Sequence, residues 1–74
     1  MSPALADVPF RKVIQALSRA GFEKVRTKGS HEVFRDAAGR VVVVPKHHVV
    51  KRGTLASILR QAGLTVSEFR DLLK

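Results

Sequence analysis

The chain has 74 residues, and its 14 lysines and arginines against six aspartates and glutamates give a formal net charge of +8 at pH 7. This length allows one domain with one small core, which is marginally stable without a partner. The absence of cysteine excludes disulfide bonds and a thiolate nucleophile, whereas the positive charge favours polyanionic partners such as RNA, DNA or an acidic protein.

The N-terminal segment lacks the features of a targeting sequence. The stretch MSPALADVPF has no basic region followed by a long apolar run, so it does not resemble a signal peptide. No apolar run approaches the roughly 18 residues that span a bilayer. We therefore expect a soluble, cytoplasmic protein without a membrane partner. Because residues 1–8 show no apolar period, we expect a flexible tail there and a single domain at residues 9–74.

An amphipathic helix is predicted at residues 9–20, because apolar residues recur there at intervals of three and four. Pro9 suits the start of a helix, and Gly21 suits a left-handed cap after its end. The apolar positions are Phe10, Val13, Ile14, Leu17 and Ala20.

Three strands are predicted next, and the short turns between them favour antiparallel hairpins. Their sequences are FEKVRTK at residues 22–28, HEVFR at residues 31–35 and VVVV at residues 41–44. If Val25 and Thr27 of the first strand face inward, Lys24, Arg26 and Lys28 form a basic stripe on the opposite face.

Two helices are predicted to close the chain. The spacing of apolar residues predicts a helix that ends before Gly63, and its apolar positions are Leu55, Ile58, Leu59 and Ala62. Thr65 and Glu68 form a capping-box pattern at the start of a short last helix within residues 65–74. The order α-β-β-β-α-α predicts an α+β fold, with helices on one face of a three-stranded antiparallel sheet and the other face in water.

The positive charge is concentrated in the middle of the chain. Residues 24–52 hold eight basic and two acidic residues, a net charge of +6, whereas the two flanking segments carry +1 each. Such a distribution favours a binding face over general solubilisation. Lys51 and Arg52 precede the second helix, whose N-terminal N–H groups and dipole suit a phosphate. Alternatively, Thr54 caps this helix and the two cations are solvated loop charges.

The sequence gives little support for a serine hydrolase or for a metal-dependent enzyme. Ser30 is adjacent to His31, but a catalytic triad depends on spatial position, and no G-x-S-x-G motif is present. His31, His47, His48 and Glu32 are the available metal ligands, without cysteine or an H-x-x-x-H spacing. We therefore expect no metal and no cofactor.

RNA cleavage requires fewer protein groups than these two reactions, because RNA carries its own nucleophile in the 2′-hydroxyl group. A histidine serves as base or acid at neutral pH, and lysines and arginines bind the phosphate. His31 in its basic surroundings fits this chemistry, although a histidine beside a hairpin turn is more often an ordinary surface residue. Strand alternation leaves its direction open: it faces solvent with Arg35 if Phe34 is buried, and the core if Val33 is buried.

Motifs over about residues 8–73 resemble those of the HicA family. They are GSH at 29–31, VPKH at 44–47, GTLASILRQAGLT at 53–65 and EF at 68–69, together with the helix-to-strand stretch ALSRAGFEKVRTKGSHEVF. HicA proteins are toxins of type II toxin–antitoxin pairs that resemble a double-stranded-RNA-binding domain in fold. The resemblance implies a metal-independent mRNA interferase, an endoribonuclease that arrests translation, with a HicB-type antitoxin covering its active site.

The resemblance also implies roles for particular residues. The family's functional histidine in Gly-Ser-His falls on His31, which implies that His31 is catalytic, and His47 matches the histidine of Pro-x-His. The candidate RNA contacts are Lys28, Ser30, Lys46, His47, Lys51 and Arg52. Two alternatives remain: a non-catalytic double-stranded-RNA-binding module that uses the same basic face, and a decayed toxin that only binds its antitoxin.

Overall fold

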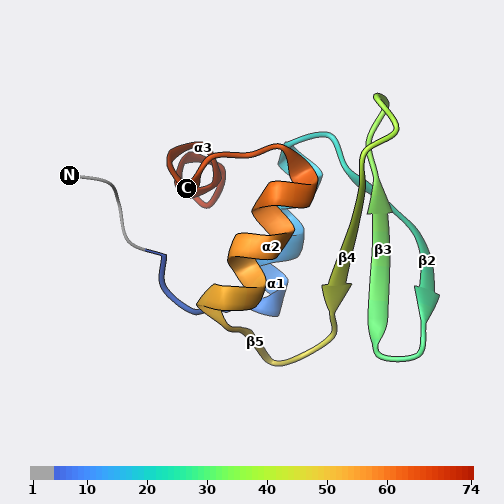
Figure 1. Ribbon diagram of the computed structural model, residues 1–74, viewed down its shortest axis with the longest axis horizontal. Coiled ribbons are helices and arrows are strands. Elements are labelled where there is room, and N and C mark those ends of the chain that lie inside the picture. The colour runs from blue at the N-terminus through green and yellow to red at the C-terminus, as the bar shows by residue number, and fades with distance from the viewer. Residues whose placement is uncertain (1–4) are drawn as a thin grey trace.

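The computed structural model describes residues 5–74, so the part of the expected tail at residues 1–4 lies outside the described residues. Within residues 5–74, the fold contains three helices, a three-stranded sheet and a separate pair of two-residue strands, and Figure 1 shows the helices beside the sheet. The elements are β1 (Val8–Pro9), α1 (Phe10–Arg19), β2 (Glu23–Lys28), β3 (His31–Arg35), β4 (Val41–Pro45), β5 (Val49–Val50), α2 (Arg52–Ala62) and α3 (Val66–Leu72). Within the described residues, no helix is long and apolar enough to cross a membrane.

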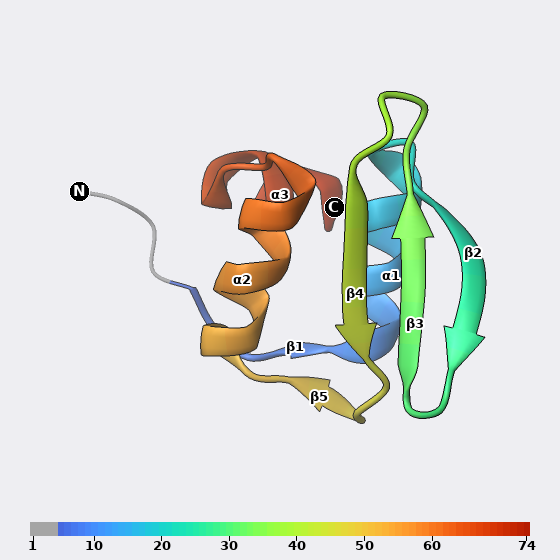
Figure 2. The ribbon, with the colours of Figure 1, turned by 45° about the vertical axis from the view of Figure 1, so that its right-hand side comes forward.

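The three-stranded sheet is an antiparallel meander in the order β2–β3–β4. The central strand β3 pairs with β4 along its whole length, from His31 opposite Pro45 to Arg35 opposite Val41. The helices lie on one side of the sheet, as Figures 1 and 2 show from two directions. This confirms the predicted α+β class and is consistent with the arrangement of a double-stranded-RNA-binding domain. We call the uncovered side of the sheet the open face.

The core lies between the sheet and the helices. Phe34 of β3 and Val42 and Val44 of β4 project toward the helices and are almost completely buried. Leu17 of α1 and Leu55 of α2 belong to the same apolar cluster and are fully buried. Each such side chain contributes roughly 1.5–3 kcal/mol to folding. The alternation of Phe34, Val42 and Val44 therefore decides which residues the sheet presents on its open face.

The helix ends follow the signals in the sequence. Gly63 ends α2 in the left-handed conformation, with a φ of +70°. At the start of α3, the Thr65 N–H donates to Glu68 Oε1 at 2.8 Å, and the Glu68 N–H donates to Thr65 Oγ1 at 3.0 Å. This confirms the capping box. Hydrogen bonds from the backbone and then the side chain of Thr65 hold the pKa of the Glu68 carboxyl below its ordinary value.

The expected alternation of the first strand holds only in part. Thr27 lies opposite Glu32 and so shares the helix side of the sheet, but Val25 is 54% exposed, and every residue of β2 is exposed. The pairing with β3 shifts between Lys24 and Arg26, so Val25 is the extra residue of a β-bulge. A bulge breaks the alternation of side chains that the prediction assumed.

The bulge also divides the predicted basic stripe between the two faces. Lys24 lies opposite Phe34 and so shares the helix side of the sheet, where its Nζ atom lies 4.0 Å from a carboxylate oxygen of Glu32. Arg26 and Lys28 lie beyond the bulge and share the open face with their partners on β3. The open face thus carries two of the three expected cations of this strand.

The folded structure begins before Pro9, contrary to the predicted boundary. Val8 and Pro9 form β1 and pair antiparallel with Val50 and Val49 of β5. Val8 is 9% exposed and belongs to the core cluster. A two-residue strand has no periodic signal, so the sequence alone did not distinguish this segment from a tail.

Candidate functional site

The turn between β2 and β3 sets the position of the GSH motif. Lys28 and His31 are the last paired residues of the hairpin, so Gly29 and Ser30 form a two-residue loop. Gly29 has a φ of +58°, whereas Ser30 has a negative φ. This pattern is that of a type II′ turn, which requires glycine at its first position and matches the twist of the strands. Gly29 thus shapes the turn that leads directly into His31.

His31 lies on the open face at the end of the sheet. Phe34 projects into the core, and the alternation along β3 therefore directs His31 to the opposite side with Arg35. This settles the two alternatives left by the sequence. His31 is exposed, and its direct neighbours across the strands are Lys28 on β2 and Pro45 on β4.

Val33 is buried although it shares the open face with His31. It lies between Arg26 of β2 and Val43 of β4, which are its partners across the strands, and it is not part of the main core cluster. Cross-strand neighbours on one face lie about 5 Å apart, close enough to cover a small side chain. Both apolar residues of HEVFR are therefore buried, but only one of them faces the helices.

The loop after β4 is held against the hairpin turn. The Lys46 N–H donates to the Ser30 carbonyl oxygen at 2.6 Å, and the His47 N–H donates to the Pro45 carbonyl oxygen at 2.9 Å. The backbone of Ser30 therefore has a clear structural role, which leaves its hydroxyl for solvent or ligand. These bonds bring Lys46 and His47 to the same end of the molecule as His31.

The start of α2 completes this end of the molecule, and the alternative in which Thr54 caps the helix is wrong. Lys51 is the N-cap residue and provides no side-chain cap, and Thr54 lies inside the helix. Instead, Asp7 Oδ1 accepts a hydrogen bond from the Arg52 N–H at 2.9 Å, and Asp7 Oδ2 lies 3.7 Å from Lys51 Nζ. Part of the positive charge at this helix end is thus met by an aspartate of the chain itself.

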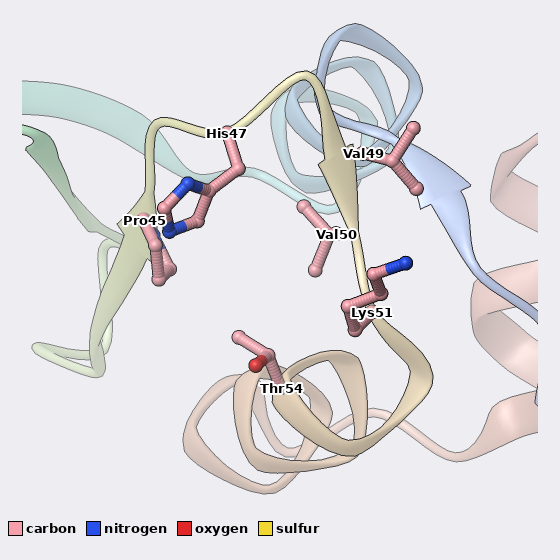
Figure 3. A pocket seen from close by; sticks show the side chains of 6 residues that line it. All are labelled: Pro45, His47, Val49, Val50, Lys51 and Thr54. Carbon is pink, nitrogen blue, oxygen red and sulfur yellow. The ribbon is translucent and has the colours of Figure 1, made fainter.

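A cavity of about 360 Å³ lies between the end of β4 and the start of α2. In Figure 3, the His47 ring lies beside Pro45 and above Thr54, while Val49, Val50 and Lys51 follow along the other wall. Pro45, Val49 and Val50 supply its apolar lining, and His47 and Thr54 supply an imidazole and a hydroxyl group. The ammonium group of Lys51 points away from the other lining side chains and lies 3.7 Å from an Asp7 carboxylate oxygen.

The structure brings all seven predicted site residues to one end of the fold, where Figure 2 shows the β2–β3 turn, the loop after β4 and the start of α2. The residues that gather there are Lys28, Ser30, His31, Lys46, His47, Lys51 and Arg52. Asp7 is a member of this end that sequence reasoning missed, since its segment carried no motif.

The residues that were available as metal ligands do not converge. Glu32 lies opposite Val44 and thus on the helix side of the sheet, whereas its neighbour His31 lies on the open face. Across residues 5–74, no group of three or more histidine, aspartate or glutamate side chains is placed to hold a metal ion.

Comparison with known protein families gave a match to a family of toxins. Residues 10–64 match the family described as the HicA toxin of bacterial toxin–antitoxin systems. A comparison with curated proteins gave no match. The matched segment runs from the start of α1 to just beyond α2 and includes β2, β3 and β4.

Proposed function

The chain belongs to the HicA family of toxins from bacterial toxin–antitoxin systems, and on that premise we propose that it is a metal-independent endoribonuclease that cleaves mRNA and arrests translation. The observation that carries the proposal is the placement of His31. It is exposed on an uncovered sheet face, directly across from Lys28, and the turn that precedes it is hydrogen-bonded to Lys46.

The proposed reaction uses the 2′-hydroxyl of the RNA as the nucleophile. A base removes the 2′-hydroxyl proton, the 2′-oxygen forms a bond to phosphorus, and the bond from phosphorus to the 5′-oxygen breaks. An acid gives a proton to the departing oxygen, so the products are a 2′,3′-cyclic phosphate and a 5′-hydroxyl. His31 acts as the base or as the acid in this scheme, a role that typically contributes about 10²–10⁴-fold to the rate.

Lysine and arginine side chains at this end of the fold are the proposed contacts to the phosphate backbone of the RNA. Lys28 is nearest in the sheet, and Lys46 follows the strand that pairs with β3. Lys51 and Arg52 extend the positive surface toward α2. Ammonium and guanidinium groups bind phosphate oxygens and stabilise the negative charge that develops during cleavage. Ser30 and His47 add a hydroxyl and an imidazole as further RNA contacts.

A HicB-type antitoxin is the proposed partner that neutralises the toxin by covering His31. The open face offers such a partner apolar surface as well as charge, because Val41 and Val43 are 48% and 38% exposed there. An acidic partner is favoured, since the toxin carries a net charge of +8. Binding to the folded toxin alone also raises its apparent stability.

Protection of His31 from chemical modification tests this masking. Diethyl pyrocarbonate modifies exposed imidazoles, and mass spectrometry locates the modified residue. We expect the antitoxin to protect His31 and to raise the unfolding temperature of the toxin. A complex in which His31 is modified as fast as in the free toxin contradicts simple masking.

Replacement of single 2′-hydroxyl groups tests the cleavage itself. An RNA with a 2′-deoxy residue at the cut site should bind with nearly unchanged affinity and resist cleavage there, while the other sites are still cut. Cleavage at the deoxy position would exclude the 2′-hydroxyl as nucleophile. Salt-sensitive binding without cleavage of either RNA at any pH would instead favour a non-catalytic RNA-binding module.

A further inference from the structure

A second cavity lies on the other side of the loop after β4. It has a volume of about 540 Å³ and lies between that loop and the start of α1. The residues that line it are Pro9, Phe10, Arg11, Lys46, His47 and His48. His47 lines this cavity and also the one at the start of α2, so the two cavities are neighbours across one side chain.

The walls of this cavity are fixed by backbone hydrogen bonding. Pro9 pairs with Val49 in the short ladder between β1 and β5, and the Phe10 N–H donates to the His48 carbonyl oxygen at 3.1 Å. The loop after β4 is in turn bound to the β2–β3 turn through Lys46 and Ser30. The cavity is therefore formed in the free protein and is coupled by direct contacts to the turn that carries His31.

Phe10 distinguishes this cavity from the rest of the surface. The chain has four phenylalanines and no tryptophan or tyrosine. Phe22, Phe34 and Phe69 are buried in the core, whereas Phe10 is half-buried, packed against the core on one side and lining the cavity. Among the described residues, it is thus the one aromatic side chain that is available to a ligand.

The side chains that line the cavity also give it a positive charge. Arg11 and Lys46 contribute two permanent cations, and His47 and His48 contribute two imidazoles. Of the described residues that line it, none is acidic. An aromatic surface beside cations matches a nucleotide, which presents a flat base and an anionic phosphate.

We propose that this cavity binds one nucleotide of single-stranded RNA, with the base against Phe10 and the adjoining phosphate held by Arg11 and Lys46. The proposal rests on the proposed function and deepens it, because it gives the substrate a second point of attachment beside the nucleotide that is cut. His31 at the turn and Phe10 at the cavity would then hold neighbouring parts of one strand. Base stacking on Phe10 is tolerant of sequence, so the cavity favours single-stranded over paired substrates.

The test measures binding rather than cleavage, in the His31→Ala background so that the RNA stays intact. A short single-stranded RNA is prepared in versions that each lack one base, and the affinity of each version is measured by fluorescence anisotropy. We expect one position at which loss of the base weakens binding about tenfold or more. Adding Phe10→Leu should remove this difference, because leucine retains apolar packing but offers no aromatic face.

Matched variants separate the cavity from general charge. Arg11→Gln should weaken RNA binding more than Lys12→Gln, since Arg11 lines the cavity and Lys12 is its exposed neighbour on α1. The abasic series needs no change beyond His31→Ala, so it remains decisive if Phe10→Leu fails to fold. Equal losses at every abasic position would overturn the proposal.

Different results would overturn the nucleotide site and the proposed endoribonuclease activity. If the wild-type protein cleaves RNA but no single base contributes to binding, the nucleotide site is wrong and the endoribonuclease stands. If no single-stranded RNA binds at low salt, both fail. If Phe10→Leu weakens binding of the antitoxin and leaves RNA binding unchanged, the cavity belongs to a protein contact, which also overturns the proposal.

Discussion

Replacement of Asp7 tests an unexpected contact between the N-terminal segment and α2. The Asp7 carboxylate accepts the Arg52 N–H at 2.9 Å and lies 3.7 Å from Lys51 Nζ. Loss of a side-chain cap at a helix N-terminus costs typically about 1 kcal/mol. The ion pair adds little, because its side chains are 43% and 77% exposed. Asp7→Ala should therefore lower the free energy of unfolding by about 1 kcal/mol and the Tm by about 4–8 °C.

Urea denaturation measures this change, with Asp71→Ala as the matched control. Asp71 also pairs with a lysine, at 3.5 Å from Lys74, but both side chains are more than 70% exposed, so its removal should change stability by less than about 0.5 kcal/mol. Equal stability of the Asp7→Ala and Asp71→Ala proteins would refute the assignment of a capping role to Asp7.

Asp7 also affects the proposed RNA site, because its negative charge lies where a phosphate would approach Lys51 and Arg52. Asp7→Asn removes the charge and keeps an oxygen acceptor for the Arg52 N–H. It should raise RNA affinity about two- to fivefold at low salt, and the gain should fade as salt screens the charge. An unchanged affinity at low salt would show that RNA does not reach the start of α2.

Two further predictions concern the turn and the last helix. Gly29→Ala forces a side chain into the left-handed region at a φ of +58°, so urea denaturation should show a free energy of unfolding that is lower by about 1–2 kcal/mol. RNA cleavage should also be weaker, because the turn positions His31. An unchanged free energy of unfolding would contradict the turn assignment. The pKa of Glu68 is lowered by its hydrogen bonds with Thr65. The stability that the carboxylate contributes is therefore present above the unfolded pKa of about 4.3 and is lost as the pH falls through the lower folded pKa. Glu68→Gln should reduce this loss of unfolding free energy at acid pH, and identical pH profiles of the wild-type and Glu68→Gln proteins would contradict the capping box as its cause.

The elements with strong periodicity could be predicted from the sequence. The apolar spacing around Leu17 and Leu55 identified α1 and α2, and the capping box identified α3. The β-branched run before Pro45 identified β4. These signals are local, since each depends on residues within a few turns of one helix or within one strand.

The errors arose where distant parts of the chain decide the structure. The bulge at Val25 depends on how β2 pairs with β3, and the burial of Val8 depends on β5, which lies about 40 residues along the chain. Strand alternation also left the direction of His31 open, because Val33 and Phe34 are both apolar. The position of the helices resolved it, since they cover the side to which Phe34 points.

The candidate site was proposed from the resemblance more than from the pattern. Spacing and charge marked Lys28 and His31 as an RNA-facing pair among several alternatives, and the motifs of the HicA family selected His31. Asp7 and Phe10 carried no such motif, and their surroundings at the start of α2 and beside the loop after β4 became clear only in three dimensions.

The central claim is that His31 moves a proton in metal-free RNA cleavage. The most direct measurement is the single-turnover cleavage rate of one RNA in the presence of a metal chelator, compared among the wild-type, His31→Ala and Lys12→Ala proteins. Lys12 is exposed on α1 and lines neither cavity. We predict rapid cleavage by the wild-type and Lys12→Ala proteins, and a rate about 10²–10⁴-fold lower for His31→Ala with retained folding and RNA binding. A His31→Ala protein that cleaves within a few-fold of the wild-type rate, or a wild-type activity abolished by the chelator, would contradict it.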